Sequence, residues 1–219
     1  MQDQLLKALN WDDLYQSLHF STLEKNQLAE ALYNTKVAAY EEALFQEAHR
    51  YLPSITKDQV HLTNQYTKGV LKKQANLHAS YILKTHNADL KKYLNIIKQD
   101  KYPLRNSLQI AQEVDKWTQA RFKKRAQLIA RTESFTPITK AQTDFYRQNK
   151  ISNTKFYFKS DKASCKVCKV LVKNNPHSLN KVLRVGIPHP NCPHQWVAHV
   201  EKKVELNPAN VWLGGANLR

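Results

Sequence analysis

The sequence predicts a mostly α-helical N-terminal body followed by a small α+β module at the C-terminus. Apolar residues recur at helical spacing over most of the first 150 residues, and the 219-residue chain has only 4 glycines. Beyond Lys150 the chain becomes rich in short runs of aromatic and β-branched residues. We therefore expect a helical region that contacts other proteins, a helical core segment and a C-terminal module, over residues 1–103, 104–150 and 151–219.

The first helices are indicated by their boundaries. Residues 5–20 predict a short amphipathic helix, and Ser21-Thr-Leu-Glu24 has the form of a capping box, so a second helix should begin there. Helical spacing continues to Leu52, and Pro53 should end this helix after about 30 residues because proline lacks an amide hydrogen.

The remaining elements follow the same patterns. Residues 56–98 predict two helices, or one with a break near Gly69 or Asn87. Residues 104–131 predict a helix that ends near Arg131, where Arg131 and Glu133 would form a local ion pair, and residues 137–148 predict another, with Pro137 in its first turn. Residues 154–159 and 195–200 predict strands, and residues 174–176 predict a turn between them. The aromatic residues Trp117, Phe122, Trp196 and Trp212 are expected in the core or in interfaces.

The positive charge lies almost entirely in the second half of the chain. Residues 1–100 contain 12 Lys and Arg against 11 Asp and Glu, whereas residues 101–219 contain 22 against 7. Such an asymmetry favours a polyanion such as double-stranded DNA, bound without sequence specificity, although a solvated basic face or an acidic protein partner would also explain it. The candidate phosphate contacts form one cluster: Arg121, Lys123, Lys124, Arg125 and Arg131.

The chain shows no signal for secretion or for a membrane. Its first residues lack a basic segment followed by an apolar one, and no window approaches the roughly 18 apolar residues of a membrane span. We therefore expect a soluble protein with no membrane partner. All 3 cysteines lie between residues 165 and 192, which favours a metal site in a reducing compartment over a disulfide framework.

Two short motifs predict a structural zinc site in the C-terminal module. Cys165 and Cys168 form a C-x2-C pair, and His189 and Cys192 repeat this spacing after 20 intervening residues. His194 is a fifth candidate, and spacing alone does not choose between the histidines, although we favour His189. Thiolate and imidazole ligands in a closed set of four suit zinc and leave no position for a reactive water, so the sequence predicts no enzymatic activity at this site.

The same segments resemble a known family. Ile129-Ala-Arg-Thr-Glu133, the aromatic strand that ends at Phe158, the C-x2-C pair and Ile187-Pro-His-Pro-Asn-Cys192 together resemble the minor head proteins of tailed bacteriophages, the head-morphogenesis family that includes the Mu F-like proteins. The resemblance covers roughly residues 105–200 and makes residues 104–150 the helical part of the family-like core. Where that family often has Cys-Arg-Cys, this chain has Cys192-Pro-His194, which makes His194 a plausible replacement ligand.

The resemblance implies a structural role in a virus particle. A minor head protein would lie inside the capsid near the portal vertex, would be found in the host cytoplasm during assembly, and would contact portal and capsid proteins. It would act in head assembly and in DNA packaging or delivery. Two other hypotheses remain: a metal-dependent nuclease, and a zinc-ribbon regulator that binds DNA.

Overall fold

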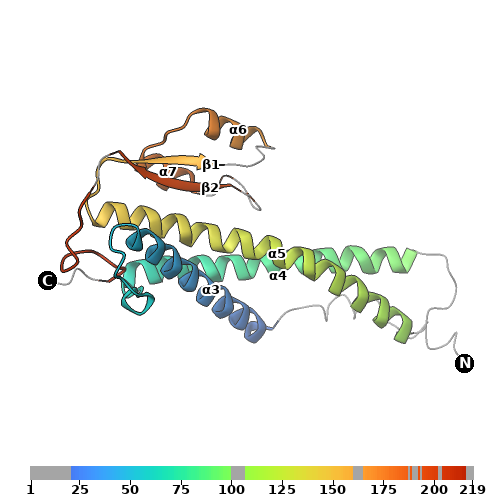
Figure 1. Ribbon diagram of the computed structural model, residues 1–219. Helices are drawn as coiled ribbons and strands as arrows, with labels where there is room; N and C mark the ends of the chain where they lie inside the picture. The colour runs from blue at the N-terminus through green and yellow to red at the C-terminus, as the bar shows by residue number, and fades with distance from the viewer. Residues whose placement is uncertain are drawn as a thin grey trace, which may run out of the picture. The chain divides into compact units, whose positions relative to one another are not determined.

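The fold is mostly helical with a small two-stranded sheet near the C-terminus, as the sequence predicts (Figure 1). The computed structural model describes residues 21–99, 107–159, 165–186, 188, 192, 194–201 and 204–215. Its elements are α3 (Thr22–His49), the 3-10 helix η1 (Lys57–Gln59), α4 (Gln65–Gln99), α5 (Ser107–Gln148), β1 (Thr154–Lys159), α6 (Lys166–Lys173), α7 (Leu179–Val185) and β2 (Gln195–Val200). The helix predicted over residues 5–20 lies outside the described residues.

The start of α3 confirms the predicted capping box. The backbone amide of Ser21 donates to Glu24 Oε2 at 2.7 Å, and the amide of Glu24 donates to Ser21 Oγ at 3.2 Å. The two side chains thus satisfy amides that the first turn of a helix leaves without a partner.

Two predicted helix breaks are wrong. Helix α4 runs without interruption through Gly69 and Asn87, and α5 runs through Pro137 instead of ending near Arg131. An interior proline removes one helical hydrogen bond, which costs roughly 3 kcal/mol or more. Two residues that follow it in α5, Ala141 and Phe145, are fully buried, and this packing outweighs the local preference.

The chain forms two compact units. One comprises residues 1–31 and 74–127, and in it Tyr93 of α4 stacks on Trp117 of α5 with ring centroids 4.7 Å apart. The other comprises residues 32–73 and 128–219 and therefore contains the whole C-terminal module. Within the described part of the chain, no helix is both long and apolar enough to cross a bilayer.

A single apolar core runs through the second unit. It joins α3, α5, the sheet and the C-terminal segment through Tyr40, Phe145, Phe156, Phe158 and Trp212, all of them buried. Trp196 is also buried, so the predicted core role of Trp196 and Trp212 is confirmed. Trp117 is half-buried, and the Phe122 side chain lies outside the description.

Buried charges connect α3 to α5 inside this unit. Lys36 Nζ lies 2.6 Å from Glu133 Oε2, with the two side chains 0% and 5% exposed. The side chain of Arg131 lies outside the description, so the local pair predicted between Arg131 and Glu133 stays a prediction. Between the same two helices, the hydroxyl of Tyr146 donates to Glu47 Oε2 at 2.6 Å.

The sheet confirms both predicted strands. β1 and β2 pair antiparallel, with Phe158 opposite Trp196. The other edge of β1 is covered by the predicted turn: Asn175 accepts from the Phe158 amide at 2.8 Å and donates to its carbonyl at 3.1 Å. His177 exchanges backbone hydrogen bonds with Phe156 in the same way, so this edge of β1 is held along the turn.

Candidate metal centre

The first turn of α6 brings the C-x2-C pair to the site. Cys165 is the N-cap residue, and its Sγ accepts a hydrogen bond from the Cys168 amide at 3.2 Å. This turn directs Cys168 inward, where its side chain is fully buried. The cap therefore fixes the position of the thiol at the start of the helix.

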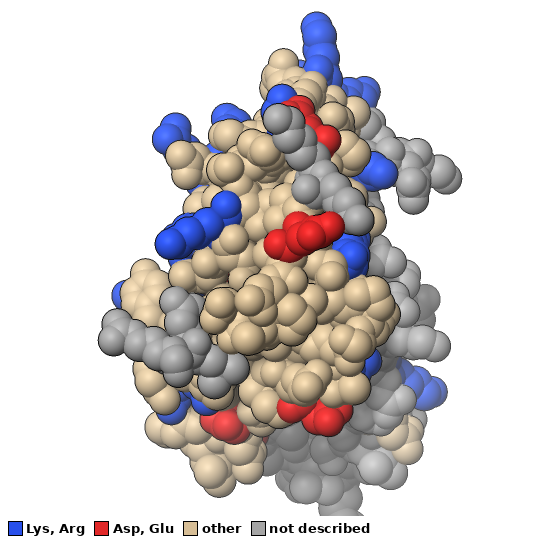
Figure 2. Space-filling model, turned by 60° about the vertical axis from the view of Figure 1, so that its left-hand side comes forward, with Lys and Arg blue, Asp and Glu red and all other residues tan. Residues whose placement is uncertain are grey.

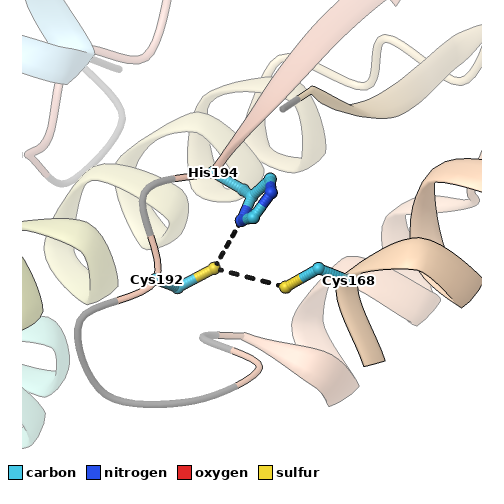
Figure 3. A group of neighbouring side chains, drawn as sticks. All are labelled: Cys168, Cys192 and His194. Carbon is cyan, nitrogen blue, oxygen red and sulfur yellow. Dashed lines mark hydrogen bonds between the residues drawn. The ribbon is translucent and has the colours of Figure 1, made fainter. Parts of the chain in front are cut away.

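The segment just before β2 supplies the other candidate ligands (Figure 3). Cys192 Sγ lies 3.7 Å from Cys168 Sγ and 3.1 Å from Nδ1 of His194. The ligand atoms of these three residues all lie within 4.8 Å of one another, and all three residues are buried. Cys168, Cys192 and His194 therefore form a cluster that could hold a metal ion.

Aromatic rings fix the orientation of His194. Its ring stacks on Phe158 of β1, with centroids 5.2 Å apart and planes at 21°, and Phe158 also contacts Trp196 at 4.6 Å. Trp196 Nε1 donates to the carbonyl of Gly186 at 3.0 Å. Gly186 ends α7 with a φ of 54°, a backbone conformation that glycine adopts without strain.

A second histidine, His177, contacts α6 through its ring. His177 Nε2 lies 2.8 Å from the carbonyl of Leu171, and its ring packs edge-on against Trp196. His177 thus ties the helix that carries Cys168 to β2 through its ring and to β1 through its backbone.

The surroundings of the Cys168 thiol oppose its ionisation. Burial raises the pKa of the Cys168 thiol, and hydrogen bonds with Cys165 and Cys192 and the negative charges that these two thiols would carry raise it further. Two adjacent thiolates are thus disfavoured in a buried site without a compensating cation. A bound divalent cation would reverse this preference, because it stabilises the thiolate directly.

The donor set fits a tetrahedral metal. Zinc–sulfur bonds of about 2.3 Å place two thiolates of a tetrahedron about 3.8 Å apart, close to the observed 3.7 Å. The 3.1 Å separation of Cys192 and His194 is shorter than the roughly 3.5 Å that the same geometry gives for sulfur and nitrogen, so one of these side chains would move by a few tenths of an ångström. A disulfide, with sulfurs about 2.05 Å apart, does not match the arrangement, and none of the three cysteines forms a disulfide.

The predicted site residues fall into three groups. Cys168, Cys192 and His194 come together, and Cys165 lies beside them as the cap of α6 without belonging to the close cluster. His189 lies outside the described residues, so the choice between the histidines rests on His194 having been placed in the cluster. The basic cluster lies on α5, and the side chains of its members are outside the description: Arg121, Lys123, Lys124, Arg125 and Arg131.

Sequence reasoning missed the residues that support the ligands. Neither the stacking of Phe158 on His194 nor the contact of His177 with Leu171 follows from ligand spacing, because both depend on how β1 pairs with its neighbours. The two-residue spacing of Phe156 and Phe158 in the sequence was the available signal, since it places both side chains on one face of a strand, and both are buried.

Comparisons with known proteins found no match. No family model matches the chain, and no curated protein or solved structure shows significant similarity to it.

Proposed function

We propose that this chain is a structural minor head protein of a tailed bacteriophage, with a C-terminal module held together by one zinc ion. The observation that carries the proposal is the buried cluster of Cys168, Cys192 and His194. Cys168 and Cys192 belong to the two short motifs on which the resemblance to the head-morphogenesis family depends, and His194 lies two residues beyond the second motif.

Zinc is the metal that suits this donor set. Two thiolates and an imidazole in a buried site are typical of structural zinc, and a closed site favours a structural role over catalysis. Cys165 and His189 are the candidates for the fourth ligand, because each belongs to one of the two motifs. When bound, the ion would connect α6 to the segment that leads into β2.

The charge distribution supports a place inside a DNA-filled particle. Residues 101–219 carry a net charge of +15, from 22 basic and 7 acidic residues, whereas the first 100 residues are nearly neutral. A capsid interior is crowded with phosphate, which the basic half would contact without sequence specificity. The near-neutral helical half would be the part that contacts portal and capsid proteins.

Co-purification tests the virion role. The chain, expressed with the capsid and portal genes that neighbour its own gene, should sediment with assembled heads and remain bound after washing in moderate salt. If the heads sediment and the chain does not sediment with them, the proposal is contradicted. Magnesium-dependent cleavage of plasmid DNA that is lost in a His194→Ala variant would instead support a nuclease.

A further inference from the structure

We propose that the outer face of α6 is a DNA-phosphate contact of this protein, an inference that rests on the proposed function and locates the interface within it. The contact is made by three lysines, Lys166, Lys169 and Lys173, here called the lysine stripe. Lys181 and Arg184 of α7, the next helix along the chain, are also exposed.

Helical geometry places the stripe on one side of α6. Its members are spaced three and four residues apart and all are exposed, whereas Cys168 and Leu171 point to the opposite side and are buried. The stripe extends roughly 10 Å along the helix at 1.5 Å per residue. That length covers about three successive phosphates of one DNA strand, which are spaced by about 3.4 Å along the axis.

The segment that carries the stripe has charges of a single sign. Residues 165–200 contain five basic residues and no Asp or Glu. Among the residues that the structure describes, no ion pair involves any member of the stripe, whereas Lys155 of β1 pairs with Glu201 at 2.8 Å. Figure 2 shows one face of the molecule, on which Lys and Arg groups are spread over a largely uncharged surface that also carries several Asp and Glu groups. Uncompensated ammonium groups attract a polyanion and release its condensed counterions.

The surface fits a phosphate backbone better than a protein. The exposed apolar residues on α6 are Val167 and Val170, which are 53% and 56% exposed. Eight residues of helix present far less than the roughly 1,000 Å² that a stable protein interface needs. Phosphate contacts require only separate, flexible point charges, which lysine provides.

The metal centre and the stripe share one helix. Cys168 holds the inner side of α6 in the cluster while the lysines point outward. Metal binding would therefore fix the helix that presents the stripe, so loss of the metal should also weaken DNA binding.

Salt-dependent titration of the full-length, metal-loaded protein with random-sequence duplex DNA tests this inference. The triple variant Lys166→Gln/Lys169→Gln/Lys173→Gln should reduce the slope of log affinity against log salt by about 2 to 3, because each phosphate contact contributes about 0.9. Its metal content and helical signal should match the wild type, since glutamine forms helices as well as lysine does.

Two controls separate the stripe from net charge and from apolar docking. The variant Lys25→Gln/Lys73→Gln/Lys84→Gln removes the same charge from exposed positions of α3 and α4 and should keep the wild-type slope. The variant Val167→Ser/Val170→Ser should also bind DNA normally. An unchanged slope in the stripe variant, an equal reduction in the lysine control, or loss of binding in the valine variant would overturn the inference. Sedimentation with heads and metal content would still report on the proposed function.

Discussion

His194 is oriented by the protein itself. Its ring stacks on Phe158, and its Nδ1 faces Cys192 Sγ at 3.1 Å. Such preorganisation lowers the cost of binding, because the ligand loses little side-chain freedom when the metal arrives. The residue that the sequence left as a spare candidate is thus already in place beside two thiols.

Replacing this imidazole tests its role. His194→Ala should weaken zinc affinity by more than the roughly 10- to 100-fold typical of changes outside the ligand set, as measured by competition with a chromogenic chelator. His199→Ala, at an exposed position of β2, is the matched control and should bind zinc normally. Unchanged zinc affinity in the His194 variant would remove this residue from the site.

Cys165 has two separable roles, as helix cap and as candidate fourth ligand. Cys165→Ser keeps a good N-cap residue, so α6 should remain folded. If Cys165 is the fourth ligand, the variant will lose most of its zinc, and His189→Ala will retain it. Metal stoichiometry of the two variants decides between them, and full zinc content in both would show that neither side chain is needed.

The buried pair of Lys36 and Glu133 should be the most sensitive charged contact in the second unit. Lys36→Met leaves the Glu133 carboxylate buried without its cation and should lower the free energy of unfolding by about 3 to 5 kcal/mol. Urea denaturation measures this change. The exposed pair of Lys57 and Glu42 provides the control, because Lys57→Met should have little effect. Equal effects of the two substitutions would contradict the assigned burial.

Among the helices and strands, sequence patterns predicted the features that depend on neighbouring residues alone. Both strands and the capping box at Ser21 are confirmed, because alternation and cap chemistry act over a few residues. The helix breaks were wrong because burial of α5 outweighs the cost of Pro137. Helices α6 and α7 were not specifically predicted, since eight and seven residues are too few for a clear period.

Only part of the candidate site could be predicted from the sequence, because only part of it depends on local spacing. The C-x2-C spacing identifies the first motif, but the choice of histidine depends on how residues far apart in sequence approach each other. The partner of Glu133 was likewise beyond local patterns, because Lys36 lies on a different helix.

The contact of Asn175 with the edge of β1 should stabilise the C-terminal module. Asn175 forms two hydrogen bonds with the backbone of Phe158, the residue on which His194 stacks. Asn175→Ala should lower the free energy of unfolding by about 1 to 3 kcal/mol, because each bond contributes roughly 0.5 to 1.5. It should also weaken zinc binding. Chemical denaturation with and without zinc measures both effects, and a variant as stable as the wild type would contradict the role of this edge.

At the scale of the whole molecule, the metal should matter to one part of the chain. All the clustered ligands belong to the unit formed by residues 32–73 and 128–219, and they lie after residue 150. A small module with few elements gains much of its stability from its metal.

Chelation should therefore act locally. A strong chelator should make the lysines between residues 150 and 185 accessible to trypsin, while α3 and α4 resist cleavage. Limited proteolysis with mass spectrometry measures this pattern, and re-addition of zinc should restore protection. Cleavage spread evenly over all helices would show instead that the metal stabilises the entire chain.

The metal content of freshly purified protein tests the central claim most directly. Elemental analysis should return about one equivalent of zinc per chain, and the three thiols should react with a thiol reagent only after the metal is removed. A folded protein with less than about a tenth of an equivalent of any transition metal, and with all three thiols freely reactive, would contradict the account.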